Sequence, residues 1–293
     1  MPERQRAYRD QRLAEPPPMR LMERDIDILQ AVYEYRTLTT DQIQTLFFTS
    51  LSQAYDRLHM LYHNAYVNRI LQGVHADKMS KPMLYVLDKR GIEILRRKRG
   101  IEVERRATLK GVTFQFLEHT LAINWVRIAV TKAAIAEGFK LVKWIGENEL
   151  KSDYDYVSIR TDTGRMKQVS VIPDGYFVLE TPRGITHCCI EVDTGMETVG
   201  VFKKKVLAYQ AYYHGGGYEG RFGAKSLRVL TITDSPKRLI NLVKMTEENA
   251  GKQRFWYTTQ EQISSKTVLT EPIWKVATKE GLSPLIRLDS VVE

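Results

Sequence analysis

The sequence of 293 residues contains only two cysteines, and these two, Cys188 and Cys189, are adjacent. A structural zinc or iron–sulfur site needs further ligands at suitable spacings, and no third or fourth cysteine is present. We therefore expect two reduced, buried thiols, which are typical of a cytoplasmic protein.

Long apolar segments are also missing. No run of 18 apolar residues occurs, so no membrane-spanning helix and no membrane partner are expected. The charged N-terminal stretch MPERQRAYRDQRLAE lacks the apolar centre of a secretory signal. The chain has no G-x-x-x-x-G-K loop and no H-E-x-x-H helix, which argues against an ATP-driven function and against a zinc-binding helix of that type.

Positive charge, by contrast, is in excess. The net charge is +9, while 43% apolar and 27% charged residues are ordinary for a globular protein. The excess is denser in the first 110 residues than in the remainder. Such a balance favours an anionic partner, most often nucleic acid.

The N-terminal third begins with an arginine-rich stretch, residues 1–19, which ends in three prolines and is expected to be a flexible basic arm. Residues 20–98 predict three helices, a hairpin and a fourth helix. Thr39 or Thr40, Ser50 or Ser52, and Asp88 are expected to begin the second, third and fourth helices. This order resembles a winged helix-turn-helix domain, in which the third helix enters the major groove and the hairpin follows the backbone.

The resemblance implies two sets of contacts with DNA. Residues at the start of the third helix would face bases: Ser50, Ser52, Gln53 and Asp56. Cations on that helix and on the hairpin would face phosphates: Arg57, Arg69, Lys78 and Lys81. On the same helix we expect Tyr55, Leu58, Leu61 and Tyr62 to point inward. Alternatively, the domain binds protein only and these charges are simply solvated.

After a predicted linker, residues 99–112, the chain predicts a second domain over residues 113–293 that includes a C-terminal extension. Its expected elements are a helix (113–138), a strand (139–146), a polar excursion (147–167), a hairpin (167–193), a helix (197–214), a strand (227–233), a helix from Ser235, and a strand within 253–259. Residues beyond 260 could not be assigned. The chain as a whole is therefore expected to be α/β, or α+β overall.

The hairpin brings acidic residues together. A turn at Thr181-Pro182-Arg183-Gly184, centred between Pro182 and Arg183, would place Asp174 opposite Glu191. Asp193 lies two residues beyond Glu191 and would point to the same face. Three carboxylates would then crowd one patch and require a cation between them.

The αβββαβ order with Pro173-Asp174 and Glu191-Val192-Asp193 resembles the PD-(D/E)xK, or restriction-endonuclease-like, superfamily. The resemblance implies that Asp174 and Glu191 hold Mg²⁺ or Mn²⁺, and that a lysine helps to activate water. Asp193 stands where the superfamily has this lysine. Either a lysine of the next helix, Lys205 above all, reaches the site, or the activity is lost and only the fold remains.

Several stretches in order are similar to the replication-relaxation proteins of bacterial plasmids and other mobile elements. They span residues 20 to about 260 and include AYDRLHMLY, FLEHTLAIN, VIPDGYFVLE, IEVDTGMET and RFWYTT. This resemblance implies a role in plasmid replication or DNA relaxation. Its candidate functional positions are Glu118, His119, Asp174, Glu191, Asp193, Glu197, Lys205 and Tyr209.

Three functions remain open from the sequence. The first is a protein that binds double-stranded DNA and nicks it, with Asp174 and Glu191 on the metal, Asp193 adding a ligand or an outer contact, Glu118 acting through water, and Lys205 orienting the nucleophile. The second is a non-enzymatic replication initiator or transcriptional regulator whose α/β domain serves dimerisation or partner binding. The third is an adaptor that binds protein. The expected partners are DNA, a second copy of the chain, and replication or mobilisation proteins of the same element.

Overall fold

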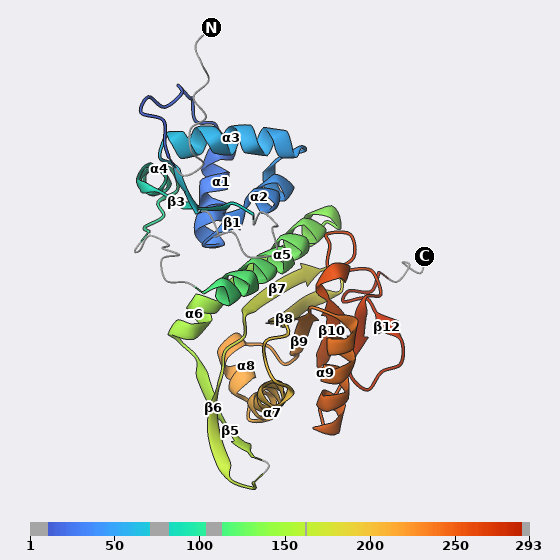
Figure 1. Cartoon of the computed structure of the whole chain (residues 1–293). Helices are drawn as coiled ribbons and strands as arrows, with labels where there is room; N and C mark the ends of the chain where they lie inside the picture. Colours follow the sequence, from blue (N-terminus) through green and yellow to red (C-terminus); the bar gives the residue numbers. More distant parts are fainter. Residues whose placement is uncertain (1–10, 71–81, 104–112, 162, 289–293) are drawn as a thin grey trace. The chain divides into compact units, whose positions relative to one another are not determined.

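The computed structural model describes residues 11–70, 82–103, 113–161 and 163–288 (Figure 1). The fold is mixed α/β, and the chain divides into two compact units, Met1–Leu117 and Glu118–Glu293. Lys78 and Lys81, predicted at the tip of the first hairpin, lie outside the described residues. None of the helices in the described ranges combines the length and the apolar character that crossing a bilayer requires.

The described part of the first unit consists of helices packed beside a small antiparallel sheet of strand order β1-β3-β2. Its elements are α1 (Glu23–Glu34), β1 (Leu38–Thr39), α2 (Thr40–Phe47), α3 (Leu51–His63), β2 (Val67–Ile70), β3 (Leu84–Leu87) and α4 (Lys89–Arg99). The order of the four helices and the β2–β3 strand pair agrees with the prediction from the sequence, whereas the short strand β1 was not predicted.

Each of three helices begins at one of the caps that the sequence predicts. The hydroxyl of Thr39 accepts a hydrogen bond from the Gln42 amide at 3.2 Å and caps α2. Ser50 accepts from the Gln53 amide at 3.4 Å and caps α3. Asp88 accepts from the amide of Lys89 at 2.7 Å and caps α4. These bonds satisfy amides that have no partner within the helix, which is why the helices begin where they do.

A buried ion pair joins α1 to α3. Asp25 is fully buried, and its Oδ1 accepts a hydrogen bond from Arg57 Nε at 2.6 Å. The Arg57 guanidinium also contacts Asp25 Oδ2 and donates to the carbonyl of Arg20 at 2.8 Å. The sequence placed Arg57 against a DNA phosphate. In the structure its donors are directed into the unit, because the buried carboxylate of Asp25 needs a cation.

The described part of the predicted arm, residues 11–19, is bonded to the first unit. Arg12 donates to the carbonyl of Tyr62 at 2.8 Å and to Asp88 Oδ2 at 2.5 Å. The amide of Leu13 donates to His63 Nδ1 at 3.0 Å, and the Pro17 carbonyl accepts from Asn64 at 2.9 Å. This part of the arm is therefore not free, since it supplies partners to polar groups of α3 and its C-terminal end.

The second unit is built on a sheet of strand order β12-β11-β10-β9-β8-β7-β4. Its helices are α5 (Phe114–Ala136, within this unit from Glu118), α6 (Glu147–Ser152), α7 (Val199–His214), α8 (Gly217–Phe222) and α9 (Pro236–Glu248). The strands of the sheet are β4 (Lys140–Gly146), β7 (Gly175–Thr181), β8 (Gly184–Asp193), β9 (Arg228–Thr233), β10 (Phe255–Thr259), β11 (Trp274–Val276) and β12 (Leu282–Ser283). Strands β8, β9 and β10 are parallel, and the other neighbouring pairs are antiparallel.

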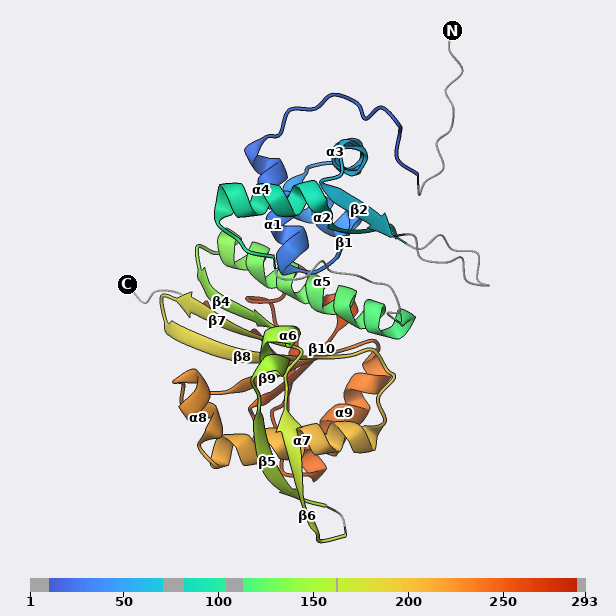
Figure 2. The same ribbon diagram turned by 90° about the vertical axis from the view of Figure 1, so that its left-hand side faces the viewer.

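Helices cover both faces of this sheet (Figure 2). On one face α5 packs against side chains such as Phe177, Ile190 and Leu230. On the other, α7 and α9 pack against alternate residues of the same strands, including Tyr176, Cys189 and Val229. This alternation explains why the central strands read as nearly continuous apolar runs.

The predicted register of the central hairpin is confirmed. Gly175 pairs with Ile190 and Thr181 with Gly184, so the turn is centred between Pro182 and Arg183. The prediction was wrong about the start of its first strand. Residues 167–171 belong instead to β6 (Met166–Val171), which pairs with β5 (Asp155–Arg160) in a separate two-stranded sheet. The predicted polar excursion therefore consists of α6, β5 and the first residues of β6.

The described part of the C-terminal extension completes the sheet. Strand β11 pairs with β10, and β12 pairs with β11. Trp274 is fully buried and donates its indole N–H to the carbonyl of Val268 at 3.0 Å. The extension therefore belongs to the core of the second unit.

Candidate functional site

Two acids lie together where β7 begins and β8 approaches its end. Asp174 immediately precedes β7, and its amide donates to the carbonyl of Ile190 at 3.0 Å, which extends the register of the hairpin. Asp174 and Glu191 are only 6% and 2% exposed. A buried carboxylate is costly unless it is bonded, so the partners of these two acids define the site.

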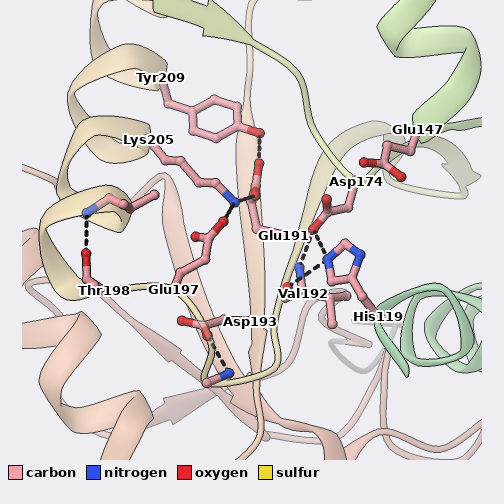
Figure 3. A network of polar contacts seen from close by, with 12 residues as sticks. His119, Glu147, Asp174, Glu191, Val192, Asp193, Glu197, Thr198, Lys205 and Tyr209 are labelled. Carbon is pink, nitrogen blue, oxygen red and sulfur yellow. Dashed lines mark hydrogen bonds and ion pairs between the residues drawn. The ribbon is translucent and has the colours of Figure 1, made fainter. Parts of the chain in front are cut away.

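Glu191 is bonded by two residues of α7 (Figure 3). Its Oε2 accepts from Lys205 Nζ at 2.9 Å, and its Oε1 accepts from the Tyr209 hydroxyl at 2.5 Å. The pKa of Glu191 is raised to about 7: burial is the main cause, the charge of Lys205 opposes it, and the nearby charge of Asp174 adds to it. Lys205 and Tyr209 are one helical turn apart, so α7 presents both to the same acid.

Lys205 is shared with a third acid. Its Nζ lies 3.0 Å from Glu197 Oε1, while Glu197 Oε2 is buried and has no hydrogen-bond partner among the described residues. Burial lowers the pKa of Lys205, but Glu191, Asp174 and Glu197 together raise it above its ordinary value. The amine therefore stays charged, and it faces more negative charge than it neutralises.

The loop that carries Glu197 depends on a glycine. Gly195 has a φ of 79°, and a Cβ there would lie 2.6 Å from Asp234 Oδ2. The positive φ favours glycine, and a Cβ there would require the exposed Asp234 carboxylate to move. Thr198 then caps α7 by accepting from the amide of Val201 at 3.3 Å. The loop thus places Glu197 one residue before the cap of the helix that carries Lys205.

Asp174 is held by His119 of α5. Its Oδ2 accepts from the amide of Val192 at 2.8 Å and lies 3.1 Å from His119 Nε2. The same nitrogen lies 3.1 Å from the carbonyl of Val192. A carbonyl can only accept, so Nε2 carries a proton. Burial lowers the pKa of His119, but the bond to Asp174 and its charge outweigh this and raise it.

A further acid, Glu147 at the start of α6, lies beside Asp174 and His119 (Figure 3). Its charge also raises the pKa of His119, and its carboxylate lies 2.5 Å from Lys151 Nζ. Sequence reasoning missed Glu147 because it falls in the polar excursion. The signal was its place directly after a predicted strand that ends in glycine.

Two predicted site residues do not join this group. Asp193 accepts two bonds from Arg238 of α9, at 2.9 and 2.7 Å, and one from the amide of Gly195 at 2.7 Å. It therefore forms a local ion pair, whereas the sequence prediction made it a further ligand or outer contact. Glu118 is exposed, because it lies about 100° around α5 from His119, which points toward Asp174.

Three of the six described residues that were predicted to contact DNA lie on the exposed side of α3. Ser52, Gln53 and Asp56 are exposed there, while Ser50 forms the cap. Arg69 of β2 is half-buried, with its guanidinium 4.2 Å from the centroid of the Tyr62 ring. The prediction that Tyr55 points inward was wrong.

Tyr55 is 49% exposed. The inward stripe of α3 is formed by Ala54, Leu58 and Leu61, and Tyr55 lies one position around the helix from it. An aromatic ring is thereby added to the exposed, otherwise polar side of α3.

The donor set can be tested against a divalent metal. Among the described residues, no three Asp, Glu, His or Cys side chains are grouped closely enough to hold a metal ion. Mg²⁺ is commonly held by one or two carboxylates, with water and substrate phosphate completing its six ligands. Asp174 and Glu191 could supply these two carboxylates. Glu191 must then exchange at least one of its present bonds, because Lys205 and Tyr209 occupy both of its oxygens.

The family of the chain follows from its match to one family model. A family model described as replication-relaxation matches residues 29–225, which is more than half of the chain. The chain belongs to the replication-relaxation family. No curated protein and no solved structure matches it. Membership connects the chain with replication and DNA relaxation, and the match spans both units, including every acid of the site described above.

Proposed function

We propose that the chain is a DNA-binding protein of a bacterial mobile element that acts in plasmid replication or DNA relaxation. Its first unit is a winged helix that reads duplex DNA, and its second unit nicks DNA with Mg²⁺ or Mn²⁺. The observation that carries the nicking proposal is the contact of Lys205 with Glu191 beside Asp174. A lysine and two buried acids are thereby assembled although Asp193 occupies the usual position of the lysine.

The first unit supports DNA binding through its element order and its surface. Three helices, with a short strand after the first, are followed by a two-stranded hairpin and a fourth helix, which is the order of a winged helix. The exposed side of α3 offers Ser52, Gln53 and Asp56 as hydrogen-bonding groups and Tyr55 as an apolar contact. Such side chains read base edges, and the net charge of +9 favours a polyanion.

The second unit supports phosphodiester chemistry. Asp174 and Glu191 would hold the metal, which lowers the pKa of bound water and neutralises charge at the phosphorus. His119 and the amide of Val192 fix the orientation of Asp174 through its Oδ2. Lys205 stays charged and is placed to orient a water or to bind a phosphate oxygen.

A second candidate function is favoured by a different observation. Lys205 and Tyr209 each donate a hydrogen bond to one oxygen of Glu191, so in this arrangement the carboxylate is not available to a metal ion. A non-enzymatic initiator or regulator would keep this closed arrangement and use its second unit for dimerisation or partner binding. It would bind duplex DNA without a metal and leave the DNA intact.

One experiment separates the two functions. Supercoiled plasmid is incubated with the full chain and Mg²⁺ or Mn²⁺, and the same protein is assayed for duplex binding by gel shift. We expect nicking by the wild type, loss of nicking with Asp174→Asn, and unchanged nicking with Glu180→Gln, an exposed acid of β7. DNA binding without nicking, or equal nicking by Asp174→Asn, would leave the non-enzymatic function. No DNA binding at all would overturn both.

A further inference from the structure

The ribbon formed by β5 and β6 projects from the second unit (Figures 1 and 2). Its ladder runs without interruption from Asp155 opposite Val171 to Arg160 opposite Met166. Six residues of extended strand span about 20 Å. An isolated two-stranded ribbon is only marginally stable in water, so something must support this one.

That support comes from one face of the ribbon. Val157, Ile159, Val169 and Val171 pack into the core that α7 covers. At the base, Asp155 accepts from the Tyr212 hydroxyl of α7 and lies 3.3 Å from an Arg221 nitrogen of α8. The ribbon is thus fastened to the helix that also carries Lys205.

The opposite face has no cover within the described part of the chain. The side chains that alternate onto it are all exposed: Tyr156, Ser158, Arg160, Met166, Gln168 and Ser170. None of them is acidic. Arg165 in the turn adds an exposed cation near the tip, whereas Lys167 pairs with Ile159 on the supported face. Asp162 lies outside the described residues.

We propose that this outer face of the β5–β6 ribbon is a second duplex-DNA contact, with the ribbon lying in a groove. The major groove admits a two-stranded ribbon, and serine and glutamine bond base edges while arginine and lysine bond phosphates. A second copy of the chain is the poorer occupant. The face carries Arg160 and no acid, so a second copy of the same face would offer it no opposite charge.

The position of the ribbon suits the acids of the candidate site. Only Ile172 and Pro173 separate the end of β6 from Asp174, so Val171 and Asp174 are at most about 10 Å apart. The base of the ribbon is thus close to Asp174 along the chain. The inference rests on the proposed function only in requiring that the chain binds duplex DNA.

The test compares two charge-reversed variants of the full chain. Arg160→Glu with Arg165→Glu changes the outer face and tip of the ribbon, and Lys244→Glu with Lys252→Glu makes the same charge change on and just beyond α9. Binding to a 30-base-pair duplex is measured by fluorescence anisotropy over a series of salt concentrations. We expect the ribbon variant to lose at least about tenfold in affinity and its salt slope to fall by about 2, since each lost phosphate contact contributes about 0.9. The control should stay within about twofold of the wild type.

Photo-crosslinking guards against a folding defect. A p-benzoylphenylalanine replaces Gln168 on the ribbon or, as control, the exposed Ile240 of α9. Crosslinking to DNA from position 168 and not from 240 supports the proposal. Crosslinking of position 168 to a second copy of the chain, or to nothing, overturns it, as does equal DNA affinity of the two charge-reversed variants. If the wild type binds and nicks DNA in those cases, the proposed function stands. If the wild type does not bind duplex, both fail.

Discussion

Each unit buries a carboxylate against a cation, yet the two ion pairs differ in how completely the charges are matched. In the first unit Arg57 holds Asp25, which is fully buried. In the second unit Lys205 holds Glu191, which is 2% exposed. The surroundings, more than the pairs themselves, separate a structural role from a functional one.

The pair in the first unit is closed. Asp25 Oδ1 accepts from Arg57 Nε, and Oδ2 accepts from the amide of Met22 and from the same guanidinium. One cation meets one anion, and the side-chain hydrogen bond to Asp25 raises the pKa of Arg57. The arrangement stabilises the junction of α1 and α3 and leaves no carboxylate oxygen over for a ligand.

The Lys205–Glu191 pair of the second unit lies among more acidic side chains than one lysine can neutralise. Lys205 meets Glu191 and Glu197 at once, and Asp174 lies close enough to raise the pKa of Glu191. One oxygen of Glu197 is buried without a partner among the described residues. Groups kept in so costly an arrangement are typical of sites that act on a ligand, because stability alone would favour matched charges.

Arg57→Met should produce the largest loss of stability. It removes the cation and leaves Asp25 buried and unpaired, which costs about 3 kcal/mol or more in the free energy of unfolding of the first unit. The measurement is urea unfolding of the full chain, with hydrogen exchange at amides of α1 and α3 to assign the loss to this unit. A loss below about 1 kcal/mol would mean that the pair is not structural.

Lys205→Met should reduce stability only slightly but reduce nicking strongly. Glu191 has a pKa of about 7, so it can take up a proton when the amine is removed, and the loss of stability should be about 1 kcal/mol. Plasmid nicking should fall at least about 100-fold, the usual effect of losing a group that acts on the nucleophile. Equal losses of stability in Lys205→Met and Arg57→Met would erase the proposed difference between the pairs.

The contrast also shows how far the sequence could lead. The opposition of Asp174 and Glu191 followed from the turn at Pro182-Arg183, because a two-residue turn fixes the whole register of a hairpin. The approach of Lys205 followed from its place early in the helix after β8. Both depend on local spacing, which a single sequence records.

Charge partners from distant elements were not predictable in the same way. Arg57 looked like a phosphate contact because its partner, Asp25, is 32 residues away, and no local pattern marks the pair. Asp193 looked like a ligand until α9 supplied Arg238. The ribbon was missed because its two short strands lie in a stretch rich in charged and polar residues, where Val157 and Ile159 were not recognised as one face of a strand.

The smallest predicted effect concerns pH and again opposes the two units. Burial, together with the charges of His59, Arg69 and Arg12, lowers the pKa of His63 to about 4. The pKa of His119, by contrast, is raised. Below pH 6.5 His63 is therefore protonated in the unfolded chain but stays neutral in the folded one. The free energy of unfolding of the first unit should fall by about 2 kcal/mol between pH 6.5 and pH 4.5.

His119 should behave in the reverse sense. Its raised pKa contributes stability that is present below the pKa of the unfolded chain and lost as the pH rises through the folded value. Urea unfolding from pH 4.5 to 8, with wild type compared with His63→Gln and His119→Gln, measures both contributions as differences. As the pH falls, the wild type should become progressively less stable than His63→Gln. Over the same range the wild type should become progressively more stable than His119→Gln. Parallel profiles for the two variants would show that the units do not treat their histidines differently.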